Sequence, residues 1–86
     1  MAWDVYILEC ADNTLYTGIT TDINRRINEH NGEGKKPGAK YTCSRRPVSL
    51  VYTETCTSRS FASKREIEIK SLKRSEKLNL IAAKLK

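Results

Sequence analysis

Arg26 and His30 have side chains and a spacing suited to phosphate or proton-transfer chemistry. They are four residues apart, so a helix would place them on one face, with Asp22 one turn earlier in the same row. Arginine keeps its charge and can present two N–H groups to a phosphate, and histidine titrates nearest neutral pH. Spacing alone nevertheless favours a surface Arg26–Asp22 pair and a solvated His30 at the end of the helix. As the only histidine, His30 excludes a histidine metal cluster and leaves a single proton-transfer group.

Two tyrosines, Tyr6 and Tyr16, flank the turn-like residues of VYILECADNTLYTGIT, residues 5–20. They are packing residues of a hairpin unless the register brings them together. A two-residue turn at Asp12 and Asn13 would point them to opposite faces of the sheet. A loop with an odd number of residues, or a bulge, would put both on one face beside Gly18.

Two glutamates, Glu66 and Glu68, stand among many bases in the segment ASKREIEIKSLKR. On a helix they lie near opposite edges of the apolar arc, which we expect to comprise Phe61, Ala62, Ile69 and Leu72. Either glutamate can be a simple partner for a nearby base, and Lys70 is at the favourable i+4 position from Glu66. Helix geometry does not choose between them.

Positive charge is segregated along the chain. Residues 1–30 carry five acids and two bases, whereas residues 31–86 carry fourteen bases and five acids. Clustered bases and a pI near 9.4 are typical of a protein whose partner is a polyanion, usually nucleic acid. We expect five bases of a central loop to contact it: Lys35, Lys36, Lys40, Arg45 and Arg46.

The sequence contains no signal peptide and no long apolar run, which predicts a cytoplasmic protein. Its three cysteines, Cys10, Cys43 and Cys56, lack the paired spacing of a zinc site. We expect them to be reduced thiols, buried or half-buried.

Local patterns predict one small domain over residues 1–86. Strands are expected at 3–10, 15–20 and 49–54, with the first two forming the hairpin. A helix over about 22–31 begins at an N-cap Thr21 and ends at Asn31 and Gly32. A loop occupies 32–47, a second helix begins at Ser58 or Ser60 and runs to about 74, and Ser75 caps a third.

The element order is therefore β-β-α-loop-β-α-α. Because the strands form a hairpin plus one, without alternation of strands and helices, this order predicts an α+β fold. We expect a three-stranded, mainly antiparallel sheet flanked by helices.

Taken together, these segments resemble the GIY-YIG nuclease domain. DVY at residues 4–6 stands where that family has Gly-Ile-Tyr, and YTG at 16–18 stands where it has Tyr-Ile-Gly. DINRRINEH at 22–30 is similar to the helix that carries the family's arginine and histidine, and ASKRE at 62–66 to the helix that carries its glutamate. Length, GAKYT and RRPVSLVY resemble a small single-domain bacterial branch of the family.

The resemblance implies a metal-dependent endonuclease that hydrolyses DNA phosphodiester bonds, usually with Mg²⁺, in repair, recombination or processing. Glu66, rather than Glu68, would hold the metal, and Arg26 would bind the scissile phosphate. Tyr6, assisted by His30, would act as or position the general base, which requires a pKa well below 10 and therefore nearby cations.

By the same resemblance, Tyr16 would orient the phosphate or the water network, and Gly18 would permit close approach of the backbone. Asp4, Val5 and Thr17 depart from the family pattern, and Asn79 is a weak match to its late asparagine. Because a chain of this length has no room for a separate targeting domain, little sequence selectivity is expected. The alternatives are a non-catalytic nucleic-acid-binding module and a protein-interaction adaptor.

Overall fold

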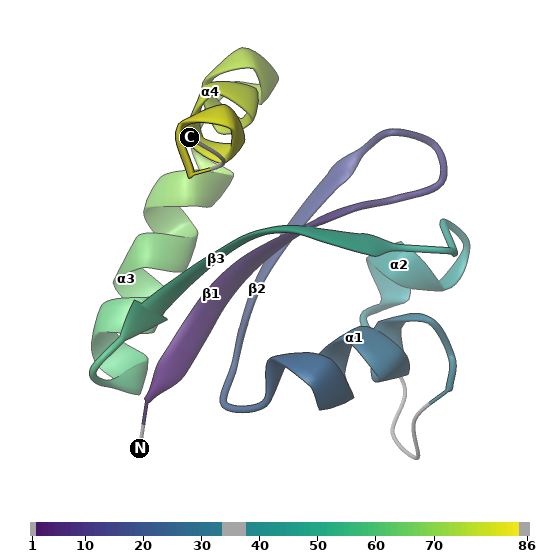
Figure 1. Ribbon diagram of the computed structural model, residues 1–86, viewed down its shortest axis with the longest axis horizontal. Helices are drawn as coiled ribbons and strands as arrows, with labels where there is room; N and C mark the ends of the chain where they lie inside the picture. Colours follow the sequence, from purple (N-terminus) through teal and green to yellow (C-terminus); the bar gives the residue numbers. More distant parts are fainter. Residues whose placement is uncertain (1, 34–37, 85–86) are drawn as a thin grey trace.

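The computed structural model describes residues 2–33 and 38–84 of the chain. Its core is a three-stranded antiparallel sheet of strand order β2-β1-β3, formed by β1 (Trp3–Glu9), β2 (Leu15–Thr20) and β3 (Ser49–Cys56). Helices α1 (Ile23–His30) and α2 (Lys40–Cys43) lie on one side of the sheet, and α3 (Arg59–Lys70) and α4 (Arg74–Lys84) lie on the other (Figure 1). The predicted α+β class and antiparallel sheet are confirmed.

The central strand is buried on both faces because helices cover both sides of the sheet. Val5 and Ile7 pack into a cluster with Ala62 and Ile69 of α3, and Tyr6 belongs to a second cluster on the opposite face. Residues alternate between the faces of a strand, so consecutive residues of one apolar run supply both cores. Ile23 and Ile27 of α1 pack against the second cluster, so this helix covers the face that contains Tyr6.

The hairpin register puts the two tyrosines on one face. Tyr6 pairs with Gly18, Leu8 pairs with Tyr16, and the strands end at the pair Glu9 and Leu15, which leaves the five residues 10–14 in the loop. Residues directly opposite each other share a face of the sheet, as do residues two apart. Of the alternatives that the sequence left open, the hairpin has the odd-numbered loop, and a two-residue turn is excluded.

Helix α1 begins one residue later than predicted, because its N-cap is Asp22 and not Thr21. The Asp22 carboxylate accepts a hydrogen bond from the backbone N–H of Arg25 at 3.1 Å, and its own N–H donates to the Thr20 hydroxyl at 3.1 Å. This contact to the end of β2 fixes where the helix starts. The predicted stop is confirmed, since Asn31 caps the helix and Gly32 has a φ of +81°.

The predicted loop over 32–47 is interrupted by the single turn α2. The carbonyl of Ala39 accepts hydrogen bonds from the backbone N–H groups of Thr42 and Cys43. Thr42 is fully buried against α1, so a tertiary contact stabilises a turn that is too short to be stable by itself.

Three boundaries near the C-terminus also differ from the prediction. Strand β3 extends to Cys56, and α3 starts after its cap Ser58 but ends at Lys70 instead of about 74. The Ser71 hydroxyl donates a hydrogen bond to the Glu68 carbonyl at 2.7 Å, so it satisfies a carbonyl that the helix itself leaves without a partner at this end. Helix α4 starts at Arg74, before the predicted cap Ser75, because the Glu76 carboxylate accepts from the N–H of Lys73.

Two expectations about burial were wrong. Phe61 is 59% exposed, because it lies in the first turn of α3 and its neighbour Ala62 takes the buried position. Cys43 is exposed at the end of α2, whereas Cys10 is buried, Cys56 is half-buried and all three thiols are free. Among the described residues, no helix is long and apolar enough to cross a membrane.

Candidate active site

Side chains from the hairpin and from α1 converge on the second face of the sheet. The Tyr6 hydroxyl lies 2.8 Å from Nε2 of His30, and the ring centroids of Tyr6 and Tyr16 are 6.4 Å apart. The Tyr16 ring lies between His30, at 5.1 Å, and Tyr41, at 5.8 Å. The two tyrosines therefore lie in one cluster with the histidine.

Gly18 makes room for Tyr6. A Cβ atom at residue 18 would lie 2.5 Å from the Tyr6 hydroxyl oxygen and 2.7 Å from Cζ, well inside van der Waals contact. The resemblance gave Gly18 the role of permitting close backbone approach. In the structure, the group that approaches its backbone is the phenol ring of Tyr6, so the glycine positions a site residue.

Arg26 pairs with Glu29 and acts on Tyr6. Its Nη1 lies 2.8 Å from Oε1 of Glu29, and the guanidinium acts to lower the pKa of Tyr6. The expected pair with Asp22 is wrong, because the Asp22 carboxylate caps the helix instead. Arg26 is thus held over the sheet by a neighbour whose side chain is only 5% exposed.

Glu29 is a site residue that the sequence reasoning missed. Its carboxylate also lies 3.6 Å from Nε of Arg25, so it forms ion pairs with two arginines. The spacings i+3 from Arg26 and i+4 from Arg25 were the available signal.

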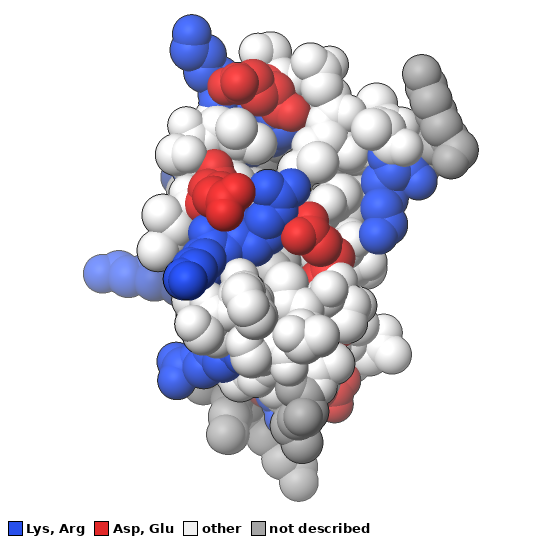
Figure 2. All heavy atoms as spheres, turned by 90° about the vertical axis from the view of Figure 1, so that its left-hand side faces the viewer, with Lys and Arg blue, Asp and Glu red and all other residues white. Residues whose placement is uncertain are grey.

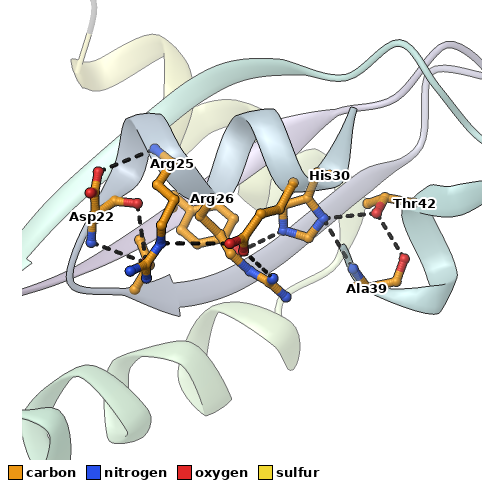
Figure 3. Close-up of polar contacts among 9 residues, drawn as sticks. Asp22, Arg25, Arg26, His30, Ala39 and Thr42 are labelled. Atoms are coloured by element: carbon orange, nitrogen blue, oxygen red, sulfur yellow. Dashed lines mark hydrogen bonds and ion pairs between the residues drawn. The ribbon is translucent and has the colours of Figure 1, made fainter. Parts of the chain in front are cut away.

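His30 is fully buried and not solvated, which corrects the simple surface interpretation. Its Nδ1 lies 2.8 Å from the Thr42 hydroxyl (Figure 3). Its Nε2 faces Tyr6, and its backbone carbonyl accepts from Arg46. Burial lowers the pKa of His30 to about 4; the charges of Arg26 and Arg46 act in the same direction, and that of Glu29 opposes them. The imidazole is therefore neutral at neutral pH.

This buried histidine predicts a loss of stability in mild acid. The folded pKa of about 4 lies below the ordinary 6.5, so the unfolded chain binds the proton more readily between these two values. The free energy of unfolding should fall by about 2–3 kcal/mol from pH 6.5 to pH 4 through this group. Urea unfolding across that range should show a weaker pH dependence in His30→Gln. Equal slopes in the two proteins would contradict the assignment.

Tyr6 does not have the low pKa that a resting general base needs. The pKa of Tyr6 is raised to about 12, chiefly by burial; the charges of Tyr16 and Glu66 also raise it, and Arg26 only partly opposes this. The side chains around Tyr6 therefore do not by themselves give the pKa well below 10 that a general-base role requires. Desolvation of a phenol with 1% exposure outweighs one guanidinium.

Glu66, and not Glu68, acts electrostatically on the site. The Glu66 carboxylate raises the Tyr6 pKa, is 22% exposed and lies 3.4 Å from Lys70. The Glu68 carboxylate is 65% exposed and pairs with Arg65 of the same helix. Helix geometry did not choose between the two glutamates, and their positions in the fold show that Glu66 is the one near the site.

The donor set around Glu66 fits Mg²⁺. Within residues 2–33 and 38–84, no group of three or more His, Cys, Asp or Glu side chains could hold a metal ion. A multi-ligand protein cage is thus absent from this part of the chain. Mg²⁺ usually keeps several waters and binds through one or two carboxylates plus substrate phosphate, so a single half-buried glutamate suits it.

The predicted nucleic-acid contacts divide into three groups. Lys35 and Lys36 lie outside the described residues, and Lys40 is exposed at the start of α2. Arg45 pairs with Asp12 of the hairpin loop at 3.1 Å, and its guanidinium lies 4.0 Å from the centre of the Tyr41 ring. Arg46 donates to the His30 carbonyl at 2.8 Å. Both arginines therefore connect the 38–48 segment to the rest of the site.

Charge is mixed on the face formed by α3 and α4. Figure 2 shows acidic and basic side chains side by side there, in keeping with the ion pairs of Arg65 with Glu54 and Glu68. Segregation along the sequence thus does not give this face one sign of charge.

Comparison with known proteins identifies the class that this fold and site define. Residues 2–79 match the GIY-YIG catalytic domain, so the chain belongs to the GIY-YIG family. Within it, the chain is 63% identical over 82 residues to a UPF0213 protein of Desulfotalea psychrophila, covering 95% of this chain and 73% of that one. It is 58% identical to a UPF0213 protein of Syntrophus aciditrophicus, covering 90% and 86%.

Solved structures agree with the fold. The solution NMR structure of a UPF0213 protein from Bacillus halodurans superposes with a TM-score of 0.62 at 48% identity, covering 98% of this chain and 86% of that one. The solution NMR structure of a protein from E. faecalis gives 0.64 at 33% identity, covering 100% and 90%. The chain is thus similar to small proteins built on the same domain.

Proposed function

We propose that this chain is a metal-dependent endonuclease that hydrolyses DNA phosphodiester bonds in repair, recombination or processing. The observation that carries the proposal is that the Tyr6 hydroxyl lies 2.8 Å from Nε2 of His30 while Arg26 and Glu66 both act on the pKa of Tyr6. A phosphate-binding cation, a proton-transfer pair and a metal-binding carboxylate are the groups that phosphodiester hydrolysis needs. These groups address phosphate and not base edges, which supports little sequence selectivity.

In this proposal each side chain has a defined task. Arg26 turns part of its guanidinium from Glu29 to the scissile phosphate and stabilises the charge that develops there. Tyr6 and His30 position the attacking water and accept its proton, and Tyr16 orients the phosphate or the water network. Glu66 would hold Mg²⁺, which when bound neutralises phosphoryl charge and lowers the pKa of nearby water.

Arg26→Ala tests the proposal in a plasmid-nicking assay with Mg²⁺. Loss of a charged transition-state donor should lower the nicking rate about 10²- to 10³-fold. Arg25→Ala is the matched control, because Arg25 precedes it, pairs with the same glutamate and is 55% exposed. Its rate should stay within about threefold, since an exposed ion pair contributes little. Metal-dependent nicking that survives Arg26→Ala would indicate a contaminant or another site.

One observation favours a second candidate, a non-catalytic nucleic-acid-binding module. The raised pKa of Tyr6 and the lowered pKa of His30 leave neither group poised as a base near neutral pH without metal. This candidate predicts salt-dependent DNA binding, no cleavage of duplex, nicked, flap, junction or single-stranded DNA, and binding unaffected by Glu66→Ala. A cleavage screen over these substrates separates the two functions.

A further inference from the structure

A continuous chain of hydrogen bonds runs from Tyr6 through the buried site to the backbone of residue 39. The Tyr6 hydroxyl lies 2.8 Å from Nε2 of His30. On the other side of the ring, Nδ1 lies 2.8 Å from the hydroxyl of Thr42, and that hydroxyl lies 2.9 Å from the carbonyl of Ala39 (Figure 3). Thr42 and His30 both have no exposed surface, so water does not compete for these contacts.

The Thr42 end of the chain sets the direction of the hydrogen bonds. A hydroxyl has one hydrogen, and Thr42 donates it to the Ala39 carbonyl. The 2.8 Å contact to His30 therefore needs its hydrogen on Nδ1. Among the described residues, the competing contact is that from the Ala39 N–H to the same nitrogen, which is longer at 3.4 Å and weaker.

The Tyr6 end is compatible with the same direction. A phenol hydroxyl can donate or accept a hydrogen bond, so this contact by itself allows either tautomer. With hydrogen on Nδ1, Nε2 of His30 accepts from the Tyr6 hydroxyl. In the opposite tautomer, Nε2 would donate to the Tyr6 oxygen, and Nδ1 would have no hydrogen for Thr42.

We infer that Thr42 is a positioning residue that holds His30 in the tautomer with hydrogen on Nδ1, so that the Nε2 lone pair faces Tyr6. The charged and titratable groups around the ring are Tyr6 and Tyr16 of the sheet, Arg26 and Glu29 of α1, and Arg46. None of them contacts Nδ1 among the hydrogen bonds of the described residues, so the Thr42 hydroxyl sets the state of that nitrogen.

The catalytic consequence rests on the proposed function. When the phenol O–H bond of Tyr6 breaks and an Nε2–H bond forms, the proton stays within the chain and gives a phenolate and an imidazolium. The imidazolium still donates through Nδ1 to Thr42, so no contact is lost. In the other tautomer Nε2 already carries hydrogen, and this transfer is blocked.

The single histidine makes the inference directly measurable. With ¹⁵N-labelled histidine, the spectrum contains one pair of imidazole nitrogens, and their shifts and couplings show which nitrogen carries hydrogen. At pH 7 without metal, wild type should show hydrogen on Nδ1. Tyr6→Phe should keep that pattern, because Thr42 and not Tyr6 sets it. Hydrogen on Nε2 in wild type, or an exchange of the pattern in Tyr6→Phe, overturns the inference.

Two substitutions at residue 42 complete the test. Thr42→Val keeps the shape, removes the hydroxyl and leaves the Ala39 N–H as the neighbour of Nδ1, so hydrogen should move to Nε2. Thr42→Ser keeps the hydroxyl and should keep the wild-type spectrum. A Thr42→Val protein that is folded and retains hydrogen on Nδ1 overturns the role of Thr42. If this variant does not fold, the wild-type and Tyr6→Phe spectra still decide.

Nicking rates add the functional measurement. Thr42→Val should lower kcat about 10- to 100-fold with little change in KM, and Thr42→Ser should stay within about threefold of wild type. An exchanged tautomer with an unchanged kcat would overturn the positioning role in catalysis. Absence of nicking in wild type would count against the proposed function, whereas the spectra would still test the tautomer.

Discussion

Glu66→Gln should reduce the rate of Mg²⁺-dependent plasmid nicking by about 10³-fold or more. A bound metal contributes several kcal/mol to transition-state stabilisation, and each 1.36 kcal/mol corresponds to a tenfold change in rate. Glutamine keeps the size of the side chain and removes the charge that a hard cation prefers. The pairing of Glu66 with Lys70 is partly exposed, so the free energy of unfolding should change by less than about 1 kcal/mol. Loss of rate without loss of stability is the expected signature.

Glu68→Gln is the matched control, on the same helix and two residues further along. Its carboxylate is 65% exposed and contacts Arg65 instead of the site. Nicking should therefore remain within about twofold of wild type, as is usual for a surface substitution. Isothermal titration with Mg²⁺ should show weaker binding in Glu66→Gln only. Equal losses of nicking in both variants would show that the charge of α3, and not a metal ligand, supports activity.

Most elements of the fold could be predicted from local patterns, because strands and capped helices have local causes. The parity of the hairpin loop could not. Asn13 has a φ of +66°, and the N–H of Ala11 donates to the carbonyl of Arg45, far along the chain. That contact, together with the Asp12–Arg45 pair, fixes a loop whose length the motif alone left open.

The composition of the site could be predicted only in part. Tyr6, Tyr16, Arg26, His30 and Glu66 are the residues that the resemblance named, and the structure relates all five through contacts or charge. Thr42 was not found, because it lies in a segment predicted as loop and meets His30 only after folding. The raised pKa of Tyr6 could not be predicted for a related reason: nearby cations can be counted in a sequence, whereas burial cannot.

Gly18→Ala should lower the free energy of unfolding by about 2–4 kcal/mol, because overpacking and a broken buried hydrogen bond add together. The new methyl group would lie 2.5 Å from the Tyr6 oxygen and 3.2 Å from the Tyr16 ring. Tyr6 cannot move aside without losing packing and a hydrogen bond, since its ring is buried and its hydroxyl contacts His30. Such a loss is a large part of the stability of a small domain.

A double-mutant cycle identifies the cause of that loss. Tyr6→Leu removes the ring atoms that the methyl group would strike, so Gly18→Ala should cost at least about 1 kcal/mol less in that background. Chemical denaturation of the four proteins gives the coupling free energy. Additive effects within about 0.5 kcal/mol would mean that the glycine does not act through Tyr6. A favourable coupling would instead show that the absence of a side chain at position 18 makes room for the phenol beside His30.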